Sequence, residues 1–162
     1  MTTINLRDDA ETVRAALERR VREFLEQNST EPVTCVEVGY CFVQCGYFFI
    51  NFDQRIPHER DGEWTGLIKD ETDMPHWQQF AEKGFDEDHI ITLPNGEQTD
   101  VWSEEAFSRA IAEMIAGAIK NASADGVFDK LPKAPNCEID VEDFEGLWAW
   151  PPFDGLGHDN LL

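Results

Sequence analysis

The chain has 162 residues, with 33 acidic and 13 basic side chains and a formal net charge of -20. This length fits a domain with a real hydrophobic core, and a hydrophobic content of 41% excludes a disordered chain. A surface this acidic repels nucleic acid and anionic membranes, so the partners that it favours are cations or basic proteins.

The first part of the chain predicts an amphipathic helix over residues 8 to 28. Asp8 is expected to cap this helix, with Glu11 three residues later. Its apolar stripe consists of Val13, Leu17, Val21, Phe24 and Leu25. No apolar leader precedes it and no apolar run approaches the roughly 18 residues of a membrane span, so we expect a soluble, cytoplasmic protein.

The most hydrophobic stretch, residues 33 to 53, predicts a central antiparallel hairpin that turns at Gly46. Apolar side chains recur at every second position on both sides of the turn, which places them on one face. These are Val36, Val38, Tyr40, Phe42, Phe48, Ile50 and Phe52. The opposite face is still largely apolar, so we expect both faces to be covered. Its residues are Cys35, Glu37, Cys41, Tyr47, Phe49 and Asn51.

Shorter elements are expected in the middle of the chain. Residues 63 to 68 could form a third strand, and residues 76 to 83 predict a short helix that starts after Pro75. The Asn95-Gly96 pair follows an apolar run and predicts the turn of a second hairpin.

A second long helix is expected over residues 103 to 124, capped by Ser103 and ended by the Asp125-Gly126 pair. A short strand over residues 137 to 141 precedes a tail rich in acidic and aromatic residues. Together these elements predict one α+β domain over residues 1–162. Its mainly antiparallel sheet is built around the central hairpin, and the two long amphipathic helices pack on it.

No motif for metal, phosphate or covalent chemistry is found. Cys41 and Cys45 would lie about 13 Å apart along an extended strand, so we interpret the cysteines as reduced packing residues. The best approach to a calcium loop, from Asp140 to Phe144, places an aromatic ring where an oxygen ligand is needed. We therefore predict no catalytic residue, no metal site and no cofactor, and do not expect an enzyme.

Acidic residues with tryptophans near them predict a surface for a basic partner, in which the tryptophans supply contact area. The same acidity would also suit a merely solubilising or halophilic surface. The predicted partner-binding residues are Asp61, Glu63, Trp64, Asp86, Glu87, Asp88, Asp100, Trp102, Asp143, Glu145, Trp148 and Trp150.

Several features together resemble bacterial immunity-like domains of polymorphic-toxin systems. These are the N-terminal amphipathic helix, the hairpin that ends in Phe52-Asp53, the Asp61-Gly62-Glu63-Trp64-Thr65 segment and the acidic Trp-Pro tail. The resemblance implies a non-enzymatic α+β protein that neutralises a cognate toxin, often a nuclease, by covering its basic active site. It transfers no binding residues.

The function predicted is therefore that of an acidic cytoplasmic binding protein, an immunity or inhibitor protein that covers a basic partner surface. Two alternatives stay open. One is a small-molecule-binding domain or small enzyme with a pocket beside the 33 to 53 hairpin. The other is an oligomeric structural subunit, and no sequence pattern sets the oligomeric state.

Overall fold

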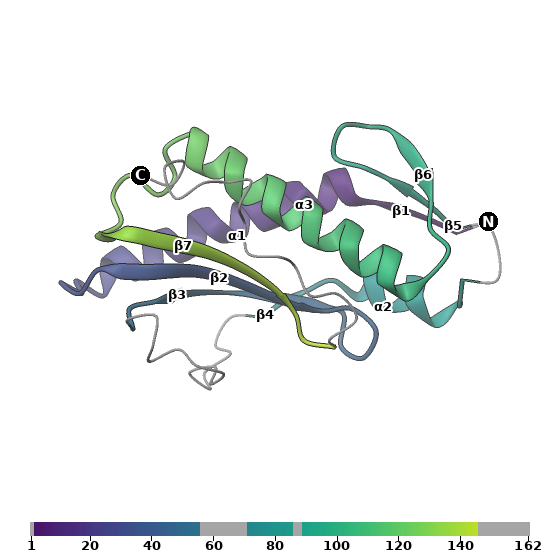
Figure 1. Cartoon of the computed structure of the whole chain (residues 1–162), viewed down its shortest axis with the longest axis horizontal. Helices are drawn as coiled ribbons and strands as arrows, with labels where there is room; N and C mark the ends of the chain where they lie inside the picture. The colour runs from purple at the N-terminus through teal and green to yellow at the C-terminus, as the bar shows by residue number, and fades with distance from the viewer. Residues whose placement is uncertain (1, 56–70, 86–88, 146–162) are drawn as a thin grey trace.

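Two sheets and three helices make up the described part of this computed structural model, which is residues 2–55, 71–85 and 89–145 (Figure 1). The predicted α+β class is confirmed. Within these residues no helix combines the length and apolar character that crossing a bilayer requires. The strand expected at residues 63 to 68 lies outside the described residues.

The larger sheet has the strand order β4-β3-β2-β7. Its strands are β4 (Glu71–Asp73), β3 (Tyr47–Asp53), β2 (Val33–Cys41) and β7 (Lys133–Asp143). β2 runs antiparallel to β3, with Val38 opposite Ile50, and parallel to β7. The parallel pairing was not predicted, because alternation along a strand defines its two faces and not the direction of its neighbour.

Helix α1 (Leu6–Glu26) begins earlier than predicted, and its cap is Asn5. The Asn5 side chain accepts the backbone N–H of Arg7 at 3.1 Å and donates to the Asp8 carboxylate at 2.8 Å. The prediction that Asp8 caps the helix is therefore wrong, because Asp8 already lies in the first turn. An acid at that position still interacts favourably with the helix dipole.

The other helices start where the sequence indicates. Pro75 opens α2 (Pro75–Glu82), and Ser103 caps α3 (Glu104–Ala124) by accepting the backbone N–H of Ala106 at 3.1 Å. α1 and α3 lie across one face of the larger sheet (Figure 1). α3 is nearly continuous in apolar residues on its buried side, which suits a helix that packs against both α1 and the sheet.

The core fills the space between these helices and the hairpin. Phe24 of α1 meets Phe52 edge to face with ring centroids 5.6 Å apart, and Phe42 meets Phe107 of α3 at 5.2 Å. Edge-to-face contacts of this kind add to the stabilisation from apolar burial. The alternating hairpin residues are buried, namely Val36, Val38, Tyr40, Phe42, Phe48, Ile50 and Phe52.

The face of the larger sheet turned away from α1 and α3, here called the outer face, is also well packed near its centre. Phe49 and Phe144 stack there with ring centroids 4.8 Å apart. Their rings cover Gly39, where a Cβ atom would lie 2.3 Å from Phe49 and 2.5 Å from Phe144. Only glycine at this position lets both rings lie flat on the sheet.

The smaller sheet has the strand order β1-β5-β6. β1 (Thr2–Asn5) pairs in parallel with β5 (His89–Thr92), and β5 pairs antiparallel with β6 (Gln98–Asp100). The hairpin expected around Asn95-Gly96 is present, with Gly96 at a φ of 88°. β1 was not predicted, because its four residues carry too few apolar positions to show a period.

Candidate functional site

An exposed tryptophan lies where β6 leads into α3, with acidic residues before and after it in the chain. Trp102 is 69% exposed, and no other large hydrophobic side chain is exposed in the described ranges. Its neighbour Val101 is buried at 3%, so the backbone is fixed here while the next side chain stands outside the core. We call this region the acidic edge, and it consists of Glu97, Asp100, Trp102, Glu104 and Glu105, all exposed.

Local hydrogen bonds hold the backbone of the acidic edge, and the Glu97 carboxylate accepts one from Asn95 Nδ2 at 2.8 Å. Val101 N–H donates to the His89 carbonyl at 2.9 Å, and Ser103 caps α3. Glu104 and Glu105 lie in the first turn of α3, where the helix dipole favours a negative charge. The fold thus holds the backbone from which these exposed side chains extend.

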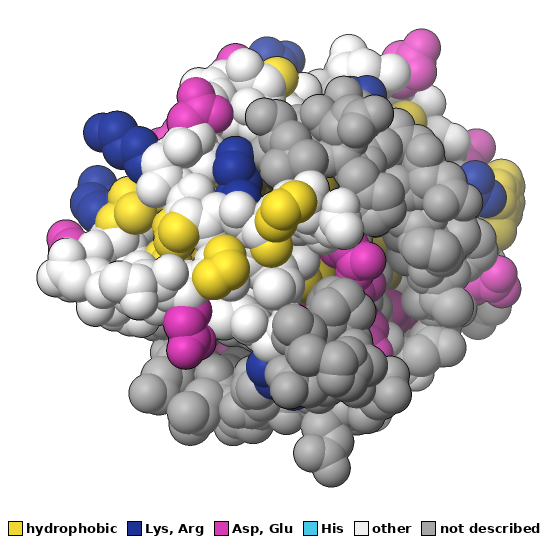
Figure 2. All heavy atoms as spheres, turned by 60° about the vertical axis from the view of Figure 1, so that its left-hand side comes forward, with side chains coloured by type: hydrophobic (Ala, Val, Ile, Leu, Met, Phe, Trp, Pro, Cys, Tyr) yellow, Lys and Arg dark blue, Asp and Glu magenta, His cyan; other side chains and the backbone are white. Residues whose placement is uncertain are grey.

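Basic side chains lie elsewhere along the chain. No lysine or arginine occurs between Lys83 and Arg109, and Arg109 itself pairs with Glu113 at 2.9 Å. Figure 2, which brings forward the left-hand side of Figure 1, shows Lys and Arg side chains on a face that also carries hydrophobic and acidic ones. Positive charge is therefore distributed unevenly over the protein.

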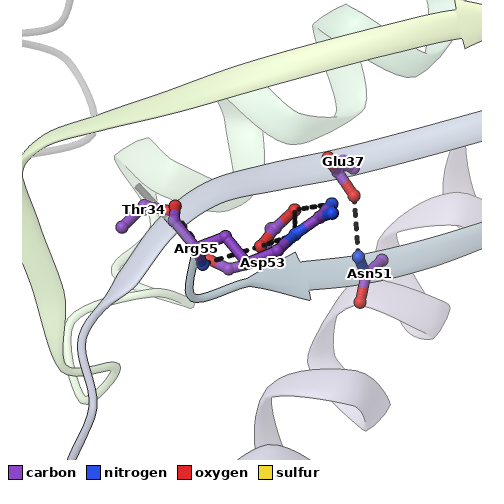
Figure 3. A network of polar contacts seen from close by, with 5 residues as sticks. All are labelled: Thr34, Glu37, Asn51, Asp53 and Arg55. Atoms are coloured by element: carbon purple, nitrogen blue, oxygen red, sulfur yellow. Dashed lines mark hydrogen bonds and ion pairs between the residues drawn. The ribbon is translucent and has the colours of Figure 1, made fainter. Parts of the chain in front are cut away.

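A second group of polar residues, the outer-face network, consists of Thr34, Glu37, Asn51, Asp53 and Arg55 (Figure 3). Arg55 Nη2 lies 2.6 Å from Asp53 Oδ2, and its backbone N–H donates to Asp53 Oδ1 at 2.8 Å. Asn51 donates to Glu37 Oε2 at 2.7 Å, and Thr34 donates to the Asp53 carbonyl at 3.1 Å. The polar groups of this network bind one another.

Glu37 is an acid of the outer-face network whose pKa is strongly shifted. Only 8% of it is exposed, and this burial raises the pKa of its carboxyl group from the ordinary 4.5 to about 7. The hydrogen bond from Asn51 lowers this pKa, while the nearby charges of Asp53 and Asp140 raise it further. Glu37 therefore takes up a proton near neutral pH, which is a property shared with catalytic carboxyl groups.

The carboxylate of Glu145 lies in the turn between β2 and β3. Its Oε2 accepts the backbone N–H groups of Val43 at 2.9 Å and Phe42 at 3.2 Å. Its Oε1 accepts that of Gln44 at 2.7 Å and the Cys41 thiol at 3.4 Å. Consecutive amides that converge in this way form a nest for an anion. Glu145 thus joins the end of β7 to this turn.

Cys41 and Cys45 lie closer together than the sequence suggests. β2 ends at Cys41 and the chain turns, so that the Cys45 thiol becomes a hydrogen-bond neighbour of Cys41. The separation of about 13 Å expected along an extended strand therefore does not apply, because the turn brings the two residues together. Burial, with contributions from Cys45 and Glu145, raises the pKa of Cys41 to about 12. Its thiol is consequently a poor nucleophile at neutral pH.

The four cysteines are free, and the described residues contain no group of three or more histidine, cysteine or acidic side chains suited to a metal ion. A structural zinc site would need four such ligands in tetrahedral geometry. The described residues therefore provide no metal centre around which a function could be argued.

A third group of polar residues is buried and joins α3 to the larger sheet. The Tyr40 hydroxyl donates to the Ser108 carbonyl at 3.0 Å and lies 2.8 Å from Ser108 Oγ. Ser108 Oγ in turn donates to Asp143, which is 5% exposed and also accepts the backbone N–H of Glu145 at 2.8 Å. Burial raises the pKa of Tyr40. These groups link β2, β7 and α3 and are not open to a ligand.

The predicted partner-binding residues fall into three sets. Asp100 and Trp102 lie together on the acidic edge, whereas Asp143 is buried and the Glu145 carboxylate is bound to backbone amides. The other eight lie outside the described residues, namely Asp61, Glu63, Trp64, Asp86, Glu87, Asp88, Trp148 and Trp150.

Glu97, Glu104 and Glu105 belong to the stretch between Lys83 and Arg109, in which the sequence has seven acids and no base and which itself indicates a surface for a basic partner. They were not among the predicted partner-binding residues, although the Ser103 cap also indicates their exposed position. A helix that begins at residue 104 leaves the preceding residues at an exposed junction.

Comparison of the chain with family models, with curated proteins and with solved structures finds no match.

Proposed function

We propose that this protein is an acidic protein-binding domain that covers a basic surface of a partner protein, as an immunity or inhibitor protein does. The observation that carries this proposal is Trp102, which is 69% exposed and has exposed acids on both sides of it in the chain. Tryptophan is one of the side chains that are enriched at the energetic centre of protein interfaces. Acids around it select a basic partner and speed its association.

The acidic edge is favoured over the outer-face network as the binding region because its side chains are available. Glu37 and Asp53 are 8% and 3% exposed, and both are held by neighbouring side chains. The raised pKa of Glu37 is the one observation that supports a small enzyme or ligand-binding domain. That alternative requires Glu37 to exchange Asn51 for a ligand, whereas Trp102 needs no rearrangement to meet a partner.

Charge also argues against an oligomeric subunit that assembles through the acidic edge. Two copies facing each other there would bring together Glu97, Asp100 and their counterparts on chains with a net charge of -20 each. Like charges placed opposite one another at an interface disfavour association. A basic partner removes this repulsion, and the resulting attraction weakens as salt screens it.

The test is affinity capture from the source organism with the wild-type protein and two charge-matched variants. One variant carries Glu97→Gln and Asp100→Asn, and its control carries Glu11→Gln and Glu26→Gln on the exposed side of α1. Both remove two negative charges. We expect the wild type and the control to capture a basic protein that the acidic-edge variant does not capture. The purified wild type should also block the activity of that basic protein. Equal capture by the two variants would refute the proposal.

A further inference from the structure

β6 is the edge strand of the smaller sheet and pairs with β5 alone among the described strands. All three of its residues, Gln98–Asp100, are exposed. An exposed edge offers unpaired backbone groups to another chain, and natural proteins usually protect such edges with charges or short strands. Both protections act here against self-pairing, but acidic side chains do not repel a basic segment.

The hydrogen bonds of the β5–β6 pair show which backbone groups face outward. Leu93 N–H donates to the Glu97 carbonyl at 2.8 Å, and Val101 N–H donates to the His89 carbonyl at 2.9 Å. In an antiparallel pair, opposite residues alternate between positions that exchange hydrogen bonds and positions that do not. Residues 97, 99 and 101 therefore turn their backbone groups toward β5.

The intervening residues of β6 have the opposite orientation. Gln98 lies opposite Thr92 and Asp100 opposite Ile90, at the positions that exchange no hydrogen bonds with β5. Their backbone N–H and C=O groups point away from the sheet. Trp102 follows two residues after Asp100, so an aromatic side chain stands at the end of this row.

We propose that the β6 edge accepts an extended segment of the partner, rich in lysine or arginine, as an added strand. Backbone groups of Gln98 and Asp100 would bind the segment, the acids would attract its charges, and Trp102 would anchor it. In strand addition the main chain supplies affinity and side-chain pockets supply specificity. This proposal rests on the proposed function and specifies how the partner is held.

The sharpest test removes one outward N–H group and nothing else from the ladder. Gln98→Pro deletes that donor while the β5 hydrogen bonds of its neighbours remain, and proline is tolerated where an edge N–H faces solvent. Gln98→Ala is the matched control, since it removes the same side chain and keeps the N–H. The probe is a synthetic peptide of alternating lysine and valine, titrated at low salt and followed by NMR of the amides of residues 97 to 102.

We expect the peptide to bind the wild type and Gln98→Ala alike and Gln98→Pro about tenfold more weakly, as the loss of a hydrogen bond in a strand pair predicts. Equal affinity for the two variants, or no binding to the wild type, would overturn strand addition. If Gln98→Pro disturbs the fold, the same peptide N-methylated at alternate residues tests strand pairing on the wild-type protein, because it lacks backbone N–H donors at those residues. Its affinity should fall by a similar factor, and an unchanged affinity refutes the proposal.

Failure of this inference can be told apart from failure of the proposed function. If the captured basic partner depends on Trp102 and on Glu97 with Asp100, but binds Gln98→Pro as well as Gln98→Ala, the acidic edge binds through side chains and strand addition is wrong. If the partner is insensitive to all of these changes, the proposed function itself fails.

Discussion

The larger sheet and the acidic edge are both rich in acidic residues, and they differ in what surrounds those residues. Near the larger sheet, Asp53 binds Arg55, Asp143 binds Ser108 and Glu145 binds backbone amides. At the acidic edge, Glu97, Asp100, Glu104 and Glu105 are exposed. Burial of a charged group is tolerated when hydrogen bonds or an opposite charge compensate it.

The net charge of -20 therefore combines two kinds of acidic residue, which have different roles. Some acids are part of the internal packing, as Asp9 also illustrates, because it is 4% exposed and accepts bonds from His76 at 2.8 Å and Trp77 at 2.7 Å. Others contribute only to the surface. Substitution of the first kind should change stability, and substitution of the second kind should change binding.

The largest effect is expected for Asp143→Ala. This change leaves the Ser108 hydroxyl and the Glu145 N–H without their acceptor in a buried region, which costs about 3 kcal/mol of unfolding free energy. Urea denaturation measures the loss. Asp140→Ala is the control, since Asp140 is exposed on the same strand, and it should cost about 0.5 kcal/mol or less. Similar losses for both would contradict the buried role of Asp143.

Glu37→Gln is expected to stabilise the protein at alkaline pH. The raised pKa of Glu37 means that the folded state holds its proton more tightly, so the contribution of Glu37 to stability falls as pH rises from about 4.5 to about 7. The glutamine variant lacks this decline and keeps an acceptor for Asn51. At pH 8 it should be more stable by on the order of 1–3 kcal/mol, and at pH 4 the two proteins should be equal.

The control for that experiment is Glu142→Gln, because Glu142 lies on the neighbouring strand β7 and is exposed. It removes the same charge and should leave the pH dependence of stability unchanged. If the stability of Glu37→Gln changed with pH in parallel with that of the wild type, the raised pKa of Glu37 would be contradicted.

Glu145→Gln should have a smaller and more local effect. A glutamine side chain has one acceptor oxygen where the carboxylate has two, so one of the amides of Val43 and Gln44 loses its partner. We expect the free energy of local opening of this turn to fall by about 1 kcal/mol. Hydrogen exchange should become faster at residues 42 to 44 and stay unchanged at Val38 and Ile50. Uniform acceleration across the sheet would mean that Glu145 stabilises the whole fold.

The alternating apolar residues of the hairpin and the Ser103 cap could be predicted because their signals are local. Periodicity of two specifies which side chains share a face, and a cap needs one side chain and the next turn of helix. The direction of β7, the pairing of β1 with β5 and the folding of Cys45 against Cys41 could not be predicted. Each depends on segments that approach one another only after the chain has folded.

The candidate site was predictable only in part for the same reason. Asp100 and Asp143 look alike in sequence, since both follow short alternating stretches near an aromatic residue. Which of them is buried depends on Ser108, which lies 35 residues before Asp143 and reaches it from α3. Exposure of Trp102 likewise depends on the edge position of β6 and not on its neighbours in sequence.

The most direct test of the contrast between the two regions measures stability and partner binding on the same Trp102→Ala protein. Because Trp102 is 69% exposed, its removal should change the unfolding free energy by about 0.5 kcal/mol or less. Binding of the captured basic partner should weaken by at least about thirtyfold, as expected for an interface anchor worth about 2 kcal/mol. A stable variant that binds the partner as tightly as the wild type would contradict the account.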